Sequence, residues 1–254
     1  MKRQVHVRIV SPITTVGFRH RAALQSLESP GLIVSGSQIT RGPGSIESEY
    51  ENAMAVPDTV LRIVEAERDG VDAVVIDCMG DPGLRPAREA VTIPVLGPCQ
   101  TAMHMAALLG HKFTVLTVMT RLIPQFENAA ALAGLSSRLA SVRSLEIPVL
   151  ELEHDLAATQ AALVEEAQKA VERDGAHAVI FGCTGLMGCA AALKDGLLER
   201  GIDIPVIDPI PTAVNLAAAI VRSNLSHSAR TYPLPPVKPM PGYDMPDLHA
   251  RAAE

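Results

Sequence analysis

Two cysteines stand at matching points of the sequence and could exchange protons with a substrate. Cys78 lies in the stretch AVVIDCMG (residues 73–80), and Cys183 lies in HAVIFGCTG (residues 177–185). Both follow a short apolar run that is typical of a buried strand, and both are followed two positions later by glycine. A thiolate can accept a proton and a thiol can donate one, so such a pair could act as base and acid in one reaction.

The surroundings of the two cysteines repeat as well, which indicates two copies of one unit. The same landmarks occur in the same order around each cysteine, and a chance match of the whole series is improbable. The shared landmarks are ERDG at residues 67–70 and 172–175, the two cysteines with their glycines, and IPV at residues 93–95 and 204–206. Cys99 and Cys189 have no equivalents in the other copy, and we interpret them as structural or incidental.

Strand and helix patterns alternate along the chain, which predicts an α/β fold with parallel strands and right-handed crossovers. We expect two pseudo-symmetric halves of about four strands each. Their boundaries are residues 1–98 with 208–226 for the first half and residues 99–207 for the second. The predicted elements include a helix over residues 15–27 and strands over residues 73–77, 148–152 and 178–182.

The C-terminal segment is different in character. Residues 227–254 form a tail, and the proline-rich part at residues 231–247 cannot be helical. Two interpretations stay open for it. It either lies as an irregular segment on the surface, or forms an arm that packs on a second subunit of a homo-oligomer.

Composition limits the partners of the protein. The 254 residues carry a net charge of -6 and no basic block, which argues against nucleic acid or an anionic membrane as a partner. No apolar run is long enough for a membrane span, and the first ten residues predict a strand rather than a signal peptide. Four cysteines without a CxxC motif favour reduced thiols. We therefore expect a cytoplasmic protein that acts on a small molecule. We also expect it to be a homo-oligomer.

The position of each cysteine, after a strand and before a helix, favours catalysis. Ligands of open α/β sheets bind beyond the carboxyl ends of the strands, where free N–H groups can lower a thiol pKa from about 8.5 towards neutrality. Two equivalent thiols on opposite sides of a ligand could invert a carbon centre without a metal or cofactor. A structural role for both cysteines, a disulfide and a zinc site are the alternatives. The expected compartment disfavours a disulfide, and the ligand spacing disfavours zinc.

Five segments of the chain resemble one protein family. The sequence is similar to the aspartate/glutamate/hydantoin racemase superfamily up to about residue 223, and to its hydantoin and allantoin racemase branch in particular. The segments are DCMGDPGL around Cys78, GCTGLMG around Cys183, RGPGSIES at residues 41–48, AMHMA at residues 102–106 and PVIDP at residues 205–209.

This resemblance implies two Rossmann-like halves with the active site in the cleft between them, and a cofactor-independent isomerase. It also implies that Cys78 and Cys183 are the two acid–base residues. The substrate-binding positions that it suggests are Ile13, Ile46, Met79, Gly80, Thr117, Val118, Thr184 and Gly185.

Some residues depart from the pattern of the branch and leave the substrate open. The branch usually has Asn-Pro-Asn after the first strand, where this chain has Ser11-Pro12-Ile13, and it often has alanine in place of Thr184. Arg19 and His20 either lie on a solvated helix face or face the cleft, where they would favour a carboxylate ligand.

We expect a racemase or epimerase of a 5-substituted hydantoin or an allantoin-like substrate. The alternatives are an amino-acid racemase, a decarboxylase or cis–trans isomerase of the superfamily, and a binding protein without turnover.

Overall fold

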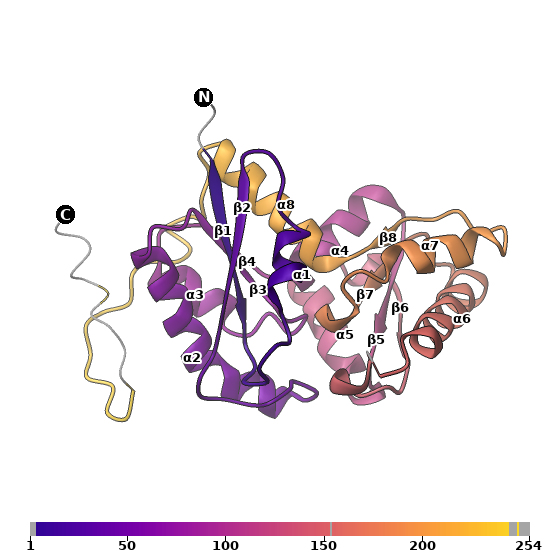
Figure 1. Ribbon diagram of the computed structural model, residues 1–254, viewed down its shortest axis with the longest axis horizontal. Helices are drawn as coiled ribbons and strands as arrows, with labels where there is room; N and C mark the ends of the chain where they lie inside the picture. Colours follow the sequence, from indigo (N-terminus) through magenta and orange to yellow (C-terminus); the bar gives the residue numbers. More distant parts are fainter. Residues whose placement is uncertain (1–3, 153, 244–247, 249–254) are drawn as a thin grey trace.

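Two α/β halves lie side by side in the computed structural model, which describes residues 4–152, 154–243 and 248 (Figure 1). Each half contains a four-stranded sheet. The strand orders are β2-β1-β3-β4 and β6-β5-β7-β8, and every pairing between neighbouring strands is parallel. The identical order confirms the predicted fold of two related halves with parallel sheets flanked by helices.

The first half is formed by the N-terminal part of the chain. Its elements are β1 (Val5–Ser11), α1 (Arg21–Gln25), β2 (Leu32–Gln38), α2 (Glu49–Arg68), β3 (Ala73–Ile76), α3 (Leu84–Ala90) and β4 (Val95–Leu96). Helix α4 (Pro98–Leu109) follows β4 directly. The repeated ERDG motif has a physical reason, because Gly70 and Gly175 adopt left-handed φ values of 79° and 71° just after the equivalent long helices α2 and α6. A left-handed residue there favours glycine.

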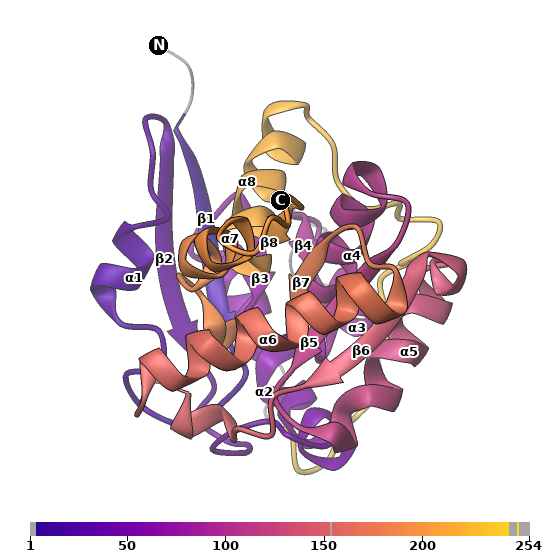
Figure 2. The same ribbon diagram turned by 90° about the vertical axis from the view of Figure 1, so that its right-hand side faces the viewer.

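The second half repeats this series. Its elements are β5 (Phe113–Thr117), the short 3-10 turn η1 (Thr120–Leu122), α5 (Ile123–Leu132), η2 (Ser136–Arg138), β6 (Leu139–Ser144), η3 (Val149–Glu151), α6 (Leu156–Asp174), β7 (Val179–Phe181), η4 (Thr184–Leu186), α7 (Ala190–Leu198) and β8 (Val206–Ile207). Helix α8 (Pro209–Arg222) follows β8. Figure 2 shows α6 lying across the outer side of this half.

Two helices cross between the halves. Helix α4 follows the first sheet, yet its residues Ala102, Met103 and Ala106 belong to the core of the second half. Helix α8 follows the second sheet, and its residues Ala213 and Val214 pack with β1 and β3 in the first half. The exchange of helices ties the halves together and holds the carboxyl ends of their strands in a fixed relation.

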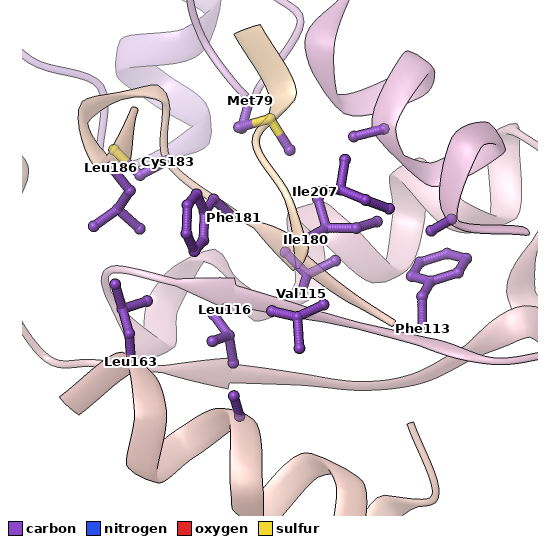
Figure 3. Packing of buried hydrophobic residues seen from close by; sticks show 14 of the residues in the cluster. Met79, Phe113, Val115, Leu116, Leu163, Ile180, Phe181, Cys183, Leu186 and Ile207 are labelled. Carbon is purple, nitrogen blue, oxygen red and sulfur yellow. The ribbon is translucent and has the colours of Figure 1, made fainter. Parts of the chain in front are cut away.

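The two cores differ in their side chains. Three phenylalanines, Phe113, Phe126 and Phe181, are fully buried in the second half, whereas the clusters of the first half consist of aliphatic residues. Figure 3 shows Phe113 and Phe181 among the β5 and β7 residues, with Met79 reaching into this core from the first half. The turn after β3 is therefore anchored in the opposite half.

Two predicted elements are wrong. Residues 15–20 are not helical, and α1 covers only Arg21–Gln25. Gly17 has a φ of 87°, which a right-handed helix does not allow. The strand predicted over residues 148–152 is a turn that contains η3, and the edge strand is β6 instead. Strand β6 is half-buried throughout and lacks the continuous apolar run of a central strand, so its pattern was not distinctive.

The described part of the tail packs on its own chain, and Leu248 lies against the core of the first half. Ser226 Oγ donates to the carbonyl of Thr92, and His227 Nε2 lies 2.9 Å from the carbonyl of Val91. Arg88 Nη1 donates to Tyr232 Oη at 3.3 Å. These contacts favour the interpretation of a surface segment for this part, and residues 244–247 and 249–254 lie outside the described residues. Among the described residues, no helix is long and apolar enough to cross a membrane.

Candidate active site

The two cysteines occupy equivalent turns at the carboxyl ends of β3 and β7. The N–H of Gly80 donates to Cys78 Sγ at 3.4 Å, and the N–H of Gly185 donates to Cys183 Sγ at 3.3 Å. Cys78 is half-buried, and Cys183 is 8% exposed. Each sulfur thus accepts a hydrogen bond from the N–H of the glycine two positions further on, and the repeated Cys-X-Gly pattern allows this geometry.

The ionisation of the thiols differs from the expectation. Burial raises the pKa of Cys183 to about 11, although the N–H of Gly185 and the guanidinium of Arg19 act in the opposite direction. Burial raises the pKa of Cys78 further, and the charges of Cys183, Asp81 and Asp77 add to this. The predicted lowering towards neutrality is therefore wrong for this structure, because one N–H group does not offset removal from water. Cys183 is the more acidic thiol of the two.

The two turns adjoin directly. Thr184 Oγ1, one residue after Cys183, donates to the carbonyl of Asp77, one residue before Cys78, at 3.1 Å. Glu47 makes a second link, since its Oε1 accepts the N–H of Val149 at 2.8 Å. Both bonds run from one half to the other. The Thr184 hydroxyl, predicted to face the ligand, is engaged by the opposite half in this structure.

Two predicted binding residues lie in an apolar cluster with Cys78. Ile13 and Ile46 are 5% and 8% exposed, and they pack with Ile39 and Ala55. Phe18 and Cys78 lie against the same cluster. The first thiol therefore has an aliphatic wall on one side.

The next three predicted residues have their side chains in the core of the second half. Met79, Thr117 and Val118 are all nearly inaccessible. The hydroxyl of Thr117 is buried and has no hydrogen-bond partner among the described residues. Their side chains therefore point into the core of the second half in this structure.

A small cavity opens beside Gly185. Its volume is about 210 Å³, and one wall is the segment of residues 15–18 from the first half. The other wall consists of Val149, Leu150 and Leu152 from the second half. A Cβ atom on Gly185 would lie 3.4 Å from Cys183 Sγ, so the cavity wall at this glycine lies close to the sulfur. The lining side chains of the cavity are apolar except that of Thr15, and two of the lining residues are glycines.

Two amide side chains that the sequence analysis did not identify meet over Gly80. A Cβ atom on this glycine would clash with Asn52 Oδ1 and would lie 2.7 Å from Gln125 Nε2. Asn52 comes from α2 in the first half, and Gln125 comes from α5 in the second. Asn52 Oδ1 and Gln125 Oε1 are buried, and neither has a hydrogen-bond partner among the described residues. Nothing in the local sequence distinguishes them from solvated helix residues.

Asp81 fixes the turn after Cys78. Its backbone has a left-handed φ of 45°, and its carboxylate accepts the N–H groups of Cys99 and Gln100 at 3.0 and 2.9 Å. These N–H groups belong to the first turn of α4, where a carboxylate is favourable. Burial raises the pKa of Asp81 to about 7 despite these bonds. The repeat gave no signal for this residue, since Asp81 has no equivalent in the second turn.

Arg19 and His20 take different positions. Arg19 is buried, and its guanidinium forms a bidentate pair with Asp77, with Nε to Oδ2 at 2.9 Å and Nη2 to Oδ1 at 2.7 Å. His20 is exposed and caps α1, because its Nδ1 accepts the N–H of Ala23. The prediction of a solvent-exposed side chain is thus correct for His20 and wrong for Arg19. The charge of Arg19 is already engaged, so it is not free for a substrate carboxylate.

The described residues contain no group of three or more His, Cys, Asp or Glu side chains that could hold a metal ion. The four cysteines are all free thiols. Cys99 and Cys189 are buried in the core of the second half, as expected for structural residues.

Comparison with known proteins gives matches of high coverage to one family model, one curated relative and two solved structures. A family model described as Asp/Glu/Hydantoin racemase matches residues 9–217. The hydantoin racemase of Rhizobium meliloti is 35% identical over 94% of this chain and 98% of its own length. The allantoin racemase of Klebsiella pneumoniae has a TM-score of 0.86 and 29% identity, and covers 94% of this chain and 96% of its own. The allantoin racemase of Pseudomonas fluorescens has a TM-score of 0.85 and 32% identity, over 94% and 100% of the two chains.

Proposed function

The chain belongs to the Asp/Glu/hydantoin racemase family, and we propose that it is a cofactor-independent isomerase that racemises 5-substituted hydantoins. One observation supports this more than any other. Two Cys-X-Gly turns of the same geometry come from two halves of the same strand order, and the residues that flank them are hydrogen-bonded to each other. Such a pair can present one thiol to each face of a planar intermediate.

The proposed reaction removes one proton from C5 and returns one proton to its opposite face. In one direction the Cys183 thiolate removes the proton from C5, and the electron pair of that bond moves into the neighbouring carbonyl to form an enolate. The Cys78 thiol then donates its proton to the opposite face of C5. Cys183 ends as a thiol and Cys78 as a thiolate, which is the starting state for the reverse direction. General acid–base steps of this kind contribute about 10²–10⁴-fold each.

The raised thiol pKa values fit this chemistry. A thiol that ionises with difficulty gives a strongly basic thiolate, and a strong base suits a weakly acidic C–H bond. The cost is a small thiolate fraction at neutral pH. Only the singly protonated pair is active. Because the charge of Cys183 raises the pKa of Cys78, the two thiols titrate as a unit with macroscopic pKa values.

This predicts an alkaline pH profile. With the pKa of Cys183 raised to about 11, the thiolate fraction and therefore kcat/KM should rise about tenfold for each pH unit above neutrality. The rate should fall again when the second thiol ionises or where the ring N–H of the hydantoin itself ionises. Initial racemisation rates across this range test it, with the spontaneous racemisation of each hydantoin subtracted at every pH. A flat profile from pH 7 upwards would show that a thiolate is already fully formed and would contradict the prediction.

The site offers a polar edge and an apolar side. The unpartnered oxygens of Asn52 and Gln125 beside Gly80 are acceptors, and a hydantoin ring carries two N–H donors. Ile13 with its neighbours supplies an aliphatic wall for the C5 substituent, and Val149, Leu150 and Leu152 line the cavity beside Gly185. We assign the ring to the amides and the substituent to these walls.

A substrate comparison tests this assignment. Allantoin has a polar ureido substituent, and Ile13 stands where the branch has an amide, so hydantoins with an apolar substituent should be preferred. A site that hydrogen-bonds a polar group rejects an analogue without it by as much as ~10⁴-fold, whereas an apolar wall discriminates weakly. Loss of optical rotation for allantoin, 5-isobutylhydantoin and 5-benzylhydantoin gives the ranking.

The matching variant is Ile13→Asn, which should improve allantoin relative to the two apolar hydantoins. Ile13→Val keeps the wall apolar and serves as its control. If allantoin is the best substrate of the parent and Ile13→Asn leaves the ranking unchanged, Ile13 does not set specificity. Absence of racemisation with every member of the panel would overturn the proposed function itself.

The amino-acid racemase alternative is less favoured by the site. An amino-acid substrate has a carboxylate, which a free cation in the site would stabilise. Arg19 is the cation that acts on Cys183, and its guanidinium is paired with Asp77. A hydantoin has no carboxylate, so the pairing of Arg19 with Asp77 does not weigh against it as a substrate.

A further inference from the structure

A buried ion pair lies between the two cysteine turns and takes no part in the proton transfer proposed for Cys78 and Cys183. Asp77 directly precedes Cys78, and its side chain is 0% exposed, against 7% for Arg19. Besides the bidentate bonds from Arg19, Asp77 Oδ2 accepts the hydroxyl of Ser11 at 2.9 Å. The carboxylate is thus fully enclosed next to the first thiol.

The same arginine reaches the second turn. Arg19 Nη2 donates to the carbonyl of Thr184 at 3.0 Å, and Nη1 lies 3.2 Å from Met187 Sδ. Thr184 in turn donates its hydroxyl to the carbonyl of Asp77. Arg19, Asp77 and Thr184 therefore form a closed ring of contacts between the residue before Cys78 and the residue after Cys183.

A buried pair of this kind is weak as a source of stability. Removal of two charges from water costs about as much as their attraction returns, and apolar replacements of buried pairs are often neutral or stabilising. Its position between two groups that must ionise gives it another consequence. Through a low-dielectric interior, an unpaired carboxylate would oppose the formation of either thiolate.

The charges around the thiols have opposing effects on the thiol pKa values. Asp77 raises the pKa of both Cys78 and Cys183, and Arg19 lowers that of Cys183. The other charged groups that act here are Asp81 on Cys78, Glu47 on Cys183, and Asp208 on Arg19. The pKa of Arg19 itself is raised, since the charge and hydrogen bonds of Asp77 outweigh its burial. Arg19 is the cation among these groups, and the others are acidic.

We propose that Arg19 is a positioning residue of the racemase site, which neutralises Asp77 and holds the two cysteine turns together so that a thiolate can form. This rests on the proposed function, because it concerns the same two thiols. The carboxylate fixes the guanidinium in its fork geometry, and the guanidinium in turn fixes the Thr184 carbonyl. The pair links the halves without leaving a net charge beside the bases.

The test is a titration of the thiols without substrate. Thiolate formation is followed by ultraviolet absorbance in a background with Cys99→Ala and Cys189→Ala, so that the catalytic pair supplies the only thiols, and the tyrosinate signal of the three tyrosines is subtracted. Arg19→Gln leaves the carboxylate uncompensated and should raise the pH of thiolate formation by about one unit. Asp77→Asn leaves the guanidinium uncompensated and should lower it by a similar amount. The double variant carries neither charge and should return close to the parent.

A purely structural pair gives a different pattern. It would leave the thiol titration unchanged in all folded variants, and that outcome overturns the proposal. Circular dichroism confirms folding of each variant. Should Arg19→Gln not fold, Asp77→Asn and the neutral double variant still test the sign and the cancellation, and an unchanged titration in Asp77→Asn alone is enough to overturn it.

Activity measurements separate the two parts of the proposal. Arg19→Gln should racemise about tenfold more slowly at neutral pH, with its pH profile displaced to higher pH by the same unit as its thiol titration. Arg19→Lys retains the charge but loses the fork, so its pH profile should match the parent while kcat falls. A parent enzyme that racemises no hydantoin would refute the proposed function, whereas the thiol titration would still decide the role of Arg19.

Discussion

Replacement of either Cys78 or Cys183 by serine should lower racemisation by about 10³-fold or more. A serine hydroxyl remains protonated at any pH that the fold tolerates, so the variant loses, on one face of C5, the base for one direction of the reaction and the acid for the other direction. The general acid–base contribution of one such group is about 10²–10⁴-fold. Initial rates of optical rotation loss with a 5-substituted hydantoin measure the effect. Two single variants with near-parental rates would show that the two-base mechanism is wrong.

The other two cysteines provide matched controls. Cys99→Ala and Cys189→Ala remove thiols of similar burial from the core of the second half. Neither sulfur has a role in the proposed proton transfer, so each variant should keep most of its activity once a modest loss of stability is accounted for. A loss as large as that of Cys183→Ser would point to a structural cause common to all buried cysteines.

Gly182→Ala should be the most damaging change outside the thiols. Gly182 directly precedes Cys183, and a Cβ atom there would lie 2.9 Å from the carbonyl oxygen of Leu116 and 2.9 Å from the Cα of Thr117. These are backbone atoms of β5 and cannot rotate away. Overpacking against a fixed backbone costs about 2–3 kcal/mol of unfolding free energy. Because relief requires β7 to shift, Cys183 moves too, and misplacement of a catalytic group by about 1 Å costs roughly 100-fold in rate.

Denaturant unfolding and racemisation of the same preparation test both parts of this prediction. Gly44→Ala is the stability control, since a Cβ at that position would lie 3.6 Å from Thr15 Oγ1 in ordinary contact. The control should unfold within about 0.5 kcal/mol of the parent. A Gly182→Ala enzyme with unchanged stability and rate would mean that β5 and β7 do not meet as closely as described.

The architecture could be predicted from the sequence because the repeated residues have defined structural roles. The two ERDG motifs end equivalent helices with left-handed glycines at Gly70 and Gly175. The buried strands β3 and β7 are short apolar runs that lead directly to the cysteines. These features are local, and local features can be read without a structure.

Contacts between distant segments could not be read in the same way. Arg19 belongs to a stretch with a helical pattern, and only the fold shows that this stretch is a loop that brings the guanidinium to Asp77 and Thr184. The proximity of Asn52 and Gln125 to Gly80 likewise depends on how the two halves meet. The thiol pKa values depend on burial by both halves, and the expectation from one strand–helix turn had the wrong sign. The sequence does contain one hint, an acid at Asp77 at the end of an otherwise apolar strand.

The central claim is that one thiol serves each face of the substrate carbon, and proton exchange from single enantiomers tests it most directly. Each enantiomer of a 5-substituted hydantoin is incubated in D₂O with the parent, Cys78→Ser and Cys183→Ser, and the loss of the C5 proton signal is followed by NMR against an enzyme-free control. The account predicts that the parent exchanges both enantiomers, that each variant exchanges only one without inverting it, and that the two variants exchange opposite enantiomers. Exchange of the same enantiomer by both variants, or of both enantiomers by either one, would contradict it.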